Sequence, residues 1–286
     1  MRYEAPDSVE GAVALLSAAT GEARVLAGGT DLLVQMRADV VDPDLIVDIK
    51  KIAETRAIAE EKGGWRIGAA VTGAELKDHP RLKKVWPGVI EAANLIGSTQ
   101  VQGRATLGGN LCNGSPAADS VPALIAAGAL ASLAGPQGRR DLPVEDVMLG
   151  PRKLALRKGE IVVSFLLPPR PPRSSDAYLR FIPRTEMDIA VVGAGVSLTL
   201  DGAGTITAAR VGLGAVAARV LLVTEAAQAI IGSRLDETAQ RRLEAAARAV
   251  CRPIDDKRGT IEFRTDVAAV LTRRAALIAL DRARTS

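Results

Sequence analysis

A cluster of prolines divides the chain. Pro168, Pro169, Pro171 and Pro172 fill four of five consecutive positions. Proline lacks a backbone N–H and has a fixed φ, so this segment cannot continue a β-sheet and forms a stiff connection. A chain of 286 residues is long enough for two or three domains. We therefore predict one domain over residues 1–170 and a second over residues 176–286.

The part before the prolines shows alternating helix and strand patterns. Periodicity and capping residues predict helices over 9–19, 31–36, 87–96 and 121–127, a helix opening at Thr72, and strands over 25–26, 45–49, 65–68 and 161–167. Residues 97–116 form a long stretch rich in Gly, Ser and Asn. Strand 161–167 is an almost continuous apolar run, so we expect it in the centre of a sheet with both faces buried.

The part after the prolines is predicted to be α+β. Strands are expected over 178–182, 189–200 and 206–213, with a turn at Asp201-Gly202, and helices over 225–231, 237–250 and 266–280. Gly193 and Gly195 fall inside a strand pattern, where glycine indicates a bulge or close packing.

Composition excludes several kinds of site. Two cysteines, Cys112 and Cys251, cannot hold an iron–sulfur cluster, which needs about four ligands. One histidine, His79, excludes a multi-histidine metal site. With only two Trp, two Tyr and three Phe, a base-stacking nucleic-acid surface is not expected.

The apolar segments and the charge distribution bear on location and partners. The longest apolar stretch, 121–134, is too short to span a bilayer, and the N-terminus lacks a signal-peptide pattern, so we expect a cytoplasmic protein.

The two parts of the chain differ in charge. Residues 1–150 carry a net charge of −4, and residues 151–286 carry a net charge of +8. This asymmetry reflects either an Arg-rich composition or a surface for an acidic partner or anionic ligand.

Two glycine-rich loops are the strongest functional signal. They read AGGTD at 27–31 and ATLGGN at 105–110. Paired glycines let a backbone approach a phosphate closely and turn successive N–H groups inward, and a nearby Thr hydroxyl adds a donor. One Gly-Gly pair is usually only a turn, but two such loops could hold the two phosphates of a dinucleotide.

Other candidate residues carry weaker signals. Asp119 is either an N-cap for the helix that follows or a carboxylate for ribose hydroxyls. Arg180 and Arg184 are surface arginines by default, and His79 lies in a charged stretch that does not favour catalysis. Neither GxGxxG, nor a P-loop, nor a GxSxG nucleophile elbow occurs.

These motifs resemble those of a known family. The two glycine loops are followed by SPAAD at 115–119, by Tyr178-x-Arg180-Phe181-x-x-Arg184, by DIAV at 188–191, and by PIDDKRG at 253–259 with EFR at 262–264. In this order and over nearly the whole chain, they resemble the FAD-binding subunit of molybdenum hydroxylases. That family includes the medium subunit of carbon monoxide dehydrogenase and the flavin part of xanthine dehydrogenase.

The resemblance implies an α+β fold. Its FAD-binding domain is vanillyl-alcohol-oxidase-like (PCMH-type), with subdomains at about 1–54 and 55–170. The C-terminal domain would combine a three-stranded antiparallel sheet with helices.

The resemblance also implies cofactor-binding positions. The pyrophosphate and adjoining parts would be bound by Val25, Leu26, Ala27, Gly28, Gly29, Thr30, Asp31 and Leu32, and the second phosphate loop would consist of Thr106, Gly108, Gly109 and Asn110. Leu95, Ile96 and Gly97 would lie along the cofactor. Asp119 would bind towards the ribose and adenine, Val162 would make contact through its backbone, and Arg180 would approach the isoalloxazine. The family commonly has Lys at the position of Arg180, and Arg-Asn where this chain has Gln102-Gly103.

The implied function is that of a FAD-carrying electron-transfer subunit, an oxidoreductase without an acid–base residue or metal site of its own. Substrate would be hydroxylated at a molybdenum cofactor on a large partner subunit. Electrons would then reach FAD from [2Fe-2S] clusters on a small partner subunit, and NAD⁺, a quinone or O₂ would accept them. The family assembly is a dimer of heterotrimers. Two alternatives are a stand-alone FAD oxidoreductase of the same fold and a nucleotide-binding scaffold without redox chemistry.

Overall fold

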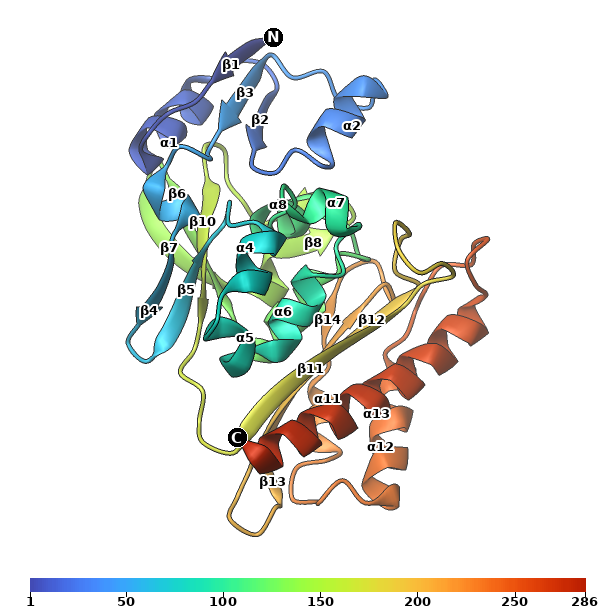
Figure 1. The fold of residues 1–286 in the computed structure, drawn as a ribbon. Helices are drawn as coiled ribbons and strands as arrows, with labels where there is room; N and C mark the ends of the chain where they lie inside the picture. The colour runs from blue at the N-terminus through green and yellow to red at the C-terminus, as the bar shows by residue number, and fades with distance from the viewer.

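The N-terminal unit is a small parallel sheet with two helices. The computed structural model describes residues 1–286. The first elements are β1 (Arg2–Glu4), α1 (Val9–Ala18), β2 (Ala23–Leu26), α2 (Leu32–Arg37) and β3 (Leu45–Asp48), with the strands in the order β1-β3-β2. Ser8 caps α1 by accepting a hydrogen bond from the Gly11 N–H at 3.2 Å, as predicted. This unit forms the top of the molecule in Figure 1.

The middle unit is built on a five-stranded antiparallel sheet with the order β4-β5-β10-β6-β7. Its strands are β4 (Ile58–Glu61), β5 (Gly64–Gly68), β6 (Leu130–Gly135), β7 (Gly138–Pro143) and β10 (Ile161–Leu167), and a small pair, β8 (Met148–Gly150) and β9 (Lys153–Leu154), lies apart. Its helices are α3 (Ala53–Arg56), α4 (Gly73–Asp78), α5 (Leu82–Val85), α6 (Pro87–Ala93), α7 (Thr99–Gln102), α8 (Leu107–Cys112), α9 (Ser120–Ala127) and α10 (Val144–Val147).

Strand β10 lies at the centre of this sheet, which confirms the expectation from its apolar run. Val162, Phe165 and Leu167 join the core under the helices, whereas Ile161 and Val163 join the core under α1. A break in the pairing between Val162 and Ser164 shifts the alternation of faces. Both faces are therefore buried, and the strand connects the N-terminal unit to the helices.

The prolines end β10, but the next strand starts earlier than predicted. Strand β11 (Ser174–Phe181) begins at Ser174 instead of at residue 178. Its polar start is buried because Asp176 pairs with Arg170 of the proline segment at 2.8 Å and accepts a hydrogen bond from the Val89 N–H of α6. The Arg170 guanidinium also stacks on Trp86 at 4.1 Å.

The C-terminal unit contains a four-stranded antiparallel sheet, where three strands were predicted. β11, β12 (Val192–Leu200) and β13 (Ile206–Gly214) are long, and the fourth strand, β14 (Leu221–Leu222), has only two residues and no pattern to predict it. The helices are α11 (Thr224–Gln228), α12 (Glu237–Ala249) and α13 (Ile261–Thr285). Helix α13 is longer than predicted because Thr260 caps it by accepting from the Phe263 N–H.

Some elements escaped prediction because their residues lack an alternating pattern. Edge strands β4 and β7 are largely exposed and polar, as edge strands often are, and β1 has only three residues. The Gly-, Ser- and Asn-rich stretch contains two short helices, α7 and α8. None of the helices is both long and apolar enough to cross a membrane.

Helix α9 joins the middle unit to the C-terminal sheet. It lies against β12 and β13, where Gly195 and Gly212 face the backbone of Pro122. A Cβ at Gly195 would lie 2.6 Å from the Pro122 carbonyl oxygen, and one at Gly212 would lie 2.3 Å from it. Glycine is therefore required here for close packing, one of the two interpretations offered by the sequence.

We expect Gly195→Ala to lower the free energy of unfolding by about 1–3 kcal/mol, because the added methyl overpacks the α9 contact. Chemical denaturation followed by circular dichroism measures this change. Gly202→Ala is the matched control, because nothing lies within 4 Å of a Cβ there. Equal stabilities of the two variants would contradict the role assigned to the α9 contact.

Candidate functional site

A pocket of about 430 Å³ lies where the N-terminal unit meets the middle unit. It is lined by both glycine-rich loops, by the start of β10 and by the β8–β9 segment. All lining residues lie between Ala23 and Val162, so the C-terminal unit contributes none.

The first loop is a turn between β2 and α2. Gly29 has φ +81°, a conformation that favours glycine, and its carbonyl accepts from the Leu33 N–H to start α2. Lys50 holds the loop from behind by donating from Nζ to the Ala27 carbonyl at 3.0 Å. The loop is therefore fixed before any ligand binds.

Lys50 is itself positioned by Asp48 at the end of β3. Its Nζ lies 2.7 Å from Asp48 Oδ2, and the Tyr3 hydroxyl donates to the same oxygen at 2.6 Å. Burial alone would raise the pKa of Asp48, but the hydrogen bonds from Lys50 and Tyr3 hold it below its usual value. Asp48 thus stays ionised and keeps Lys50 against the loop.

The second loop opens α8. Thr106 is the N-cap and its Oγ accepts from the Gly109 N–H at 3.0 Å. The Gly108 N–H donates to the Ala69 carbonyl at 3.1 Å, and a Cβ at Gly108 would lie 2.6 Å from that oxygen. Gly108 therefore serves packing against the sheet, while Gly109 completes the cap.

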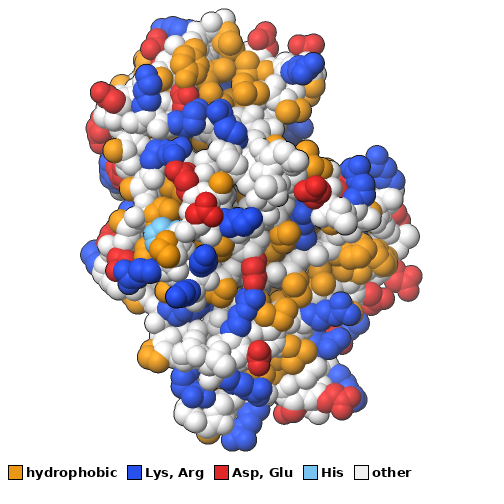
Figure 2. Space-filling view, in the orientation of Figure 1, with side chains coloured by type: hydrophobic (Ala, Val, Ile, Leu, Met, Phe, Trp, Pro, Cys, Tyr) orange, Lys and Arg blue, Asp and Glu red, His pale blue; other side chains and the backbone are white.

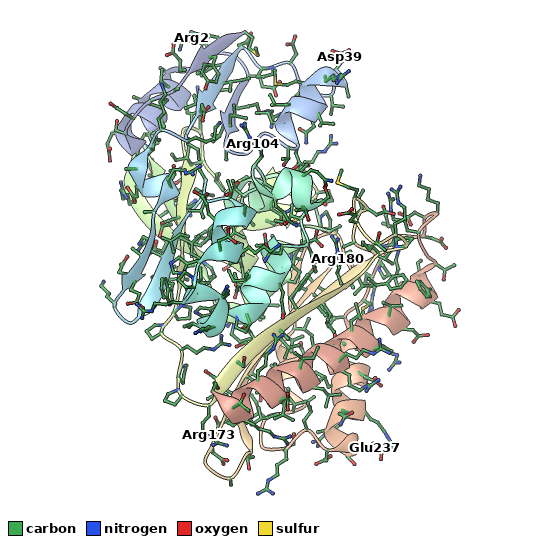
Figure 3. The ribbon with its side chains drawn as sticks, in the orientation of Figure 1. Arg2, Asp39, Arg104, Arg173, Arg180 and Glu237 are labelled. Atoms are coloured by element: carbon green, nitrogen blue, oxygen red, sulfur yellow. The ribbon has the colours of Figure 1, made fainter.

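The two loops touch each other at Gly28. A Cβ there would lie 1.9 Å from the carbonyl oxygen of Arg104, so only glycine permits this contact. The Arg104 Nε donates back to the Gly28 carbonyl at 3.2 Å. Figure 3 shows Arg104 at the junction between the N-terminal unit and the rest of the chain.

Asn113 also connects the segment after α8 to the first loop and α2. Its side-chain amide donates a hydrogen bond to Asp31, and its Oδ1 accepts one from Gln35, both at 3.0 Å.

The first loop presents unused hydrogen-bond donors. The backbone N–H groups of Gly28, Gly29 and Thr30 donate to no group of the protein. Gly28 is buried, and buried N–H groups are nearly always paired in proteins. Successive free N–H groups in a turn with a positive φ suit an anion such as a phosphate.

The pocket brings together thirteen of the eighteen residues predicted to bind the cofactor. They are Val25, Ala27, Gly28, Gly29, Thr30, Asp31, Leu32, Ile96, Thr106, Gly108, Gly109, Asn110 and Val162. Leu26, Leu95, Gly97, Asp119 and Arg180 do not line it. The pocket also includes residues that carried no motif, among them Cys112, Arg152, Leu154, Leu156 and Glu160.

Asp119 and Arg180 form a buried ion pair. Arg180 Nη1 lies 2.9 Å from Asp119 Oδ2, the two side chains are 4% and 10% exposed, and the Tyr178 hydroxyl donates to Asp119 at 3.3 Å. The two residues are therefore adjacent in the fold, and the default interpretation of Arg180 as a surface residue is wrong. Burial raises the pKa of Asp119 to about 6, an effect that Arg180 and Tyr178 offset only in part.

Asp119 does not cap α9, the other role considered for it, because its side chain makes no capping hydrogen bond. Asn110 does so instead: its Oδ1 accepts from the Ser120 N–H at 3.0 Å and from the Ser120 hydroxyl at 2.7 Å. The second glycine loop is thereby tied directly to α9. No local pattern signals this contact, because its partners are ten residues apart across a turn.

The remaining candidates have structural surroundings. His79 Nδ1 accepts from the Leu82 N–H at 3.1 Å, and its ring meets Trp65 edge-on at 5.1 Å. Arg184 is exposed and pairs with Asp188. No group of three or more His, Cys, Asp or Glu side chains is arranged to hold a metal ion.

Two family descriptions match the chain. Residues 1–170 match the FAD binding domain in molybdopterin dehydrogenase, and residues 177–279 match the CO dehydrogenase flavoprotein C-terminal domain.

The chain is also similar to individual relatives over most of its length. The carbon monoxide dehydrogenase medium chain of Afipia carboxidovorans is 34% identical over 273 residues, covering 96% of this chain and 94% of the relative. A putative xanthine dehydrogenase FAD-binding subunit of Escherichia coli is 32% identical, covering 88% and 87%.

Among solved structures, a chain of the Cu,Mo-CO dehydrogenase matches with a TM-score of 0.94 at 35% identity, covering 99% of this chain and 98% of that one. A chain of quinoline 2-oxidoreductase from Pseudomonas putida matches with a TM-score of 0.90 at 28% identity and the same coverage. These matches confirm the expected fold class, and FAD is the cofactor of this type of chain.

The pKa of Asp119 predicts a pH dependence of stability. Between about pH 4 and pH 6 the folded protein retains a proton that the unfolded chain releases, so Asp119 disfavours the folded state as pH rises. The difference in unfolding free energy between wild type and Asp119→Asn should therefore fall by roughly 3 kcal/mol from pH 4 to pH 7. Denaturant titrations at the two pH values measure it, and a difference that does not change with pH would contradict the assignment.

Proposed function

Because the chain belongs to the family of FAD-binding subunits of molybdenum-dependent dehydrogenases, we propose that it carries electrons between partner subunits and a final acceptor. Its partners would be a small subunit with [2Fe-2S] clusters and a large subunit with the molybdenum cofactor, assembled as a dimer of heterotrimers in the cytoplasm. NAD⁺, a quinone or O₂ would take up the electrons.

The observation that carries this proposal is the contact between the two glycine loops. The free N–H groups of Gly28, Gly29 and Thr30 face a pocket whose other wall contains the Thr106 cap. A pyrophosphate offers anionic oxygens to both sides, and each charge-assisted hydrogen bond contributes about 1.5–3 kcal/mol. The residues present therefore fit the phosphate portion of FAD.

When bound, FAD supplies the ability to take up and release electrons singly or in pairs. The protein residues would position it. Val25 to Leu32, with Thr106 to Asn110, would hold the phosphates, and Ile96 and Val162 would line its apolar parts. No residue of this chain is assigned as an acid or base in substrate turnover.

Asp119 and Arg180 would act together from behind the pocket wall. Because the pair is internally neutralised and buried, it would support the cofactor site through position and not through a free charge. Asp119 adjoins Ser120, which Asn110 of the second loop holds, so the pair lies next to the residues that shape this loop.

The two cysteines indicate that the iron–sulfur clusters that would supply single electrons lie on a partner subunit. Cys112 lines the pocket, whereas Cys251 is buried in the core of the C-terminal unit. Burial raises the pKa of the Cys112 thiol to about 12 and that of Cys251 to about 11. Two cysteines in different units of the fold cannot supply the roughly four ligands that a cluster needs. The clusters would therefore reside on another subunit.

Gly28→Ala should reduce FAD retention at least about tenfold, because separating the loops removes one or more charge-assisted hydrogen bonds. The ratio of flavin absorbance to protein absorbance after purification measures it. Gly103→Ala is the control on the same segment, since nothing lies within 4 Å of a Cβ there. Full flavin occupancy in Gly28→Ala would contradict the placement of the phosphates.

The isolated chain loaded with FAD should not oxidise the substrate of the complex, whereas the assembled complex should. The comparison uses the same acceptor dye and equal flavin concentrations. Substrate oxidation by the chain alone would support the stand-alone oxidoreductase instead.

A further inference from the structure

A shallow groove lies close to the cofactor pocket. It has a volume of about 550 Å³ and lies between α5–α6 on one side and β11 and α13 on the other. Its walls are mostly apolar, formed by Pro87, Ile90, Leu95, Leu179 and Ile278. Leu95 lines the groove and the next residue, Ile96, lines the cofactor pocket, so adjacent residues of one segment contribute to both.

The groove has no free negative charge. Glu91, its one carboxylate, accepts from the Tyr178 N–H at 3.1 Å and pairs with Arg282 of α13. The Asn94 Oδ1, next to these residues, is buried and accepts no hydrogen bond. The groove therefore offers an apolar surface, one neutralised carboxylate and one amide oxygen that accepts no hydrogen bond.

Its rim on the α5 side is basic. Lys83 lines the groove and Lys84 follows it, both are exposed, and neither forms an ion pair. Lys77 on α4 is likewise exposed and unpaired, while Arg81 pairs with Glu60. Figure 2 shows Lys and Arg side chains gathered around the single histidine on this side of the molecule.

We infer that this groove docks a partner subunit of the complex, through a segment that places an apolar side chain between α6 and β11 and carboxylates against Lys83 and Lys84. Charge complementarity selects an acidic segment, because the rim holds unpaired ammonium groups and the groove floor no unpaired carboxylate. An apolar anchor in a groove with a charged rim is the usual anatomy of such an interface. The inference rests on the proposed function, since it presumes a multi-subunit complex.

The position beside the pocket gives this docking site a role. A partner seated here contacts the segment Asn94–Leu95, which leads directly into the pocket residue Ile96. Docking would therefore bring the partner close to the cofactor.

The test is co-expression of this chain with its affinity-tagged partner subunits, followed by measurement of the amount of this chain bound per tagged subunit and of its flavin content. Lys83→Glu/Lys84→Glu should lower the bound amount about tenfold at moderate salt, because opposed carboxylates then repel. Ile278→Trp, which fills the groove from α13, should do the same without changing charge. Lys51→Glu/Lys158→Glu, at two exposed lysines away from the groove, should bind as wild type does.

The flavin content distinguishes failure of the docking site from failure of the proposed function. Both groove variants should keep the wild-type flavin ratio, since no mutated residue lines the cofactor pocket. Wild-type binding by both groove variants would overturn the docking site while leaving the proposed function intact. If the isolated wild-type chain forms a dimer that both groove variants lose while partner binding is unchanged, the groove belongs to an interface with a second copy, which would also overturn the docking site. Absence of flavin from the wild-type chain would instead count against the proposed function.

Discussion

The contact between Gly28 and the backbone of Arg104 is the constraint on which the site depends. The two residues are 76 positions apart: Gly28 follows strand β2 of the N-terminal unit, and Arg104 lies between helices α7 and α8 of the middle unit. Because no side chain intervenes, the first loop, with its free N–H groups, and the capped turn of the second loop line one pocket. Lys50 and Asp48 behind the first loop, and Ala69 behind the second, hold this arrangement from the two sheets.

Charge is distributed unequally around the pocket. The first glycine loop contributes backbone N–H groups that no protein group accepts, whereas the Asp119–Arg180 pair does not line the pocket and is buried, each charge balanced by the other. Backbone donors are fixed by the fold and lose no side-chain entropy on binding. A rigid, mostly uncharged cradle is thus combined with a buried polar network that fixes its support.

Local patterns in the sequence predicted the parts of the site that depend on local conformation. The Gly28-Gly29 turn, the Thr72 capping box and the central apolar strand were all recognisable, because each requires particular residue types at short spacing. Contacts between distant segments were not. No sequence pattern near Asp119 or Arg180 indicates that the two residues form an ion pair. Arg152, Leu154 and Leu156 line the pocket only because the β8–β9 pair folds beside it. The family resemblance identified the cofactor, whereas the ion pair between Asp119 and Arg180 is visible only in the structure.

Helix α9 has a consequence for how the chain responds to its cofactor. At one end Asn110 of the second loop holds Ser120, and further along Pro122 sits against glycines of β12 and β13. The C-terminal sheet thus supports the pocket without lining it. By thermodynamic linkage, a ligand that requires an ordered second loop also favours the folded state of everything that α9 needs in place. Cofactor occupancy and the integrity of the C-terminal sheet are therefore coupled equilibria, so a change that weakens one also weakens the other.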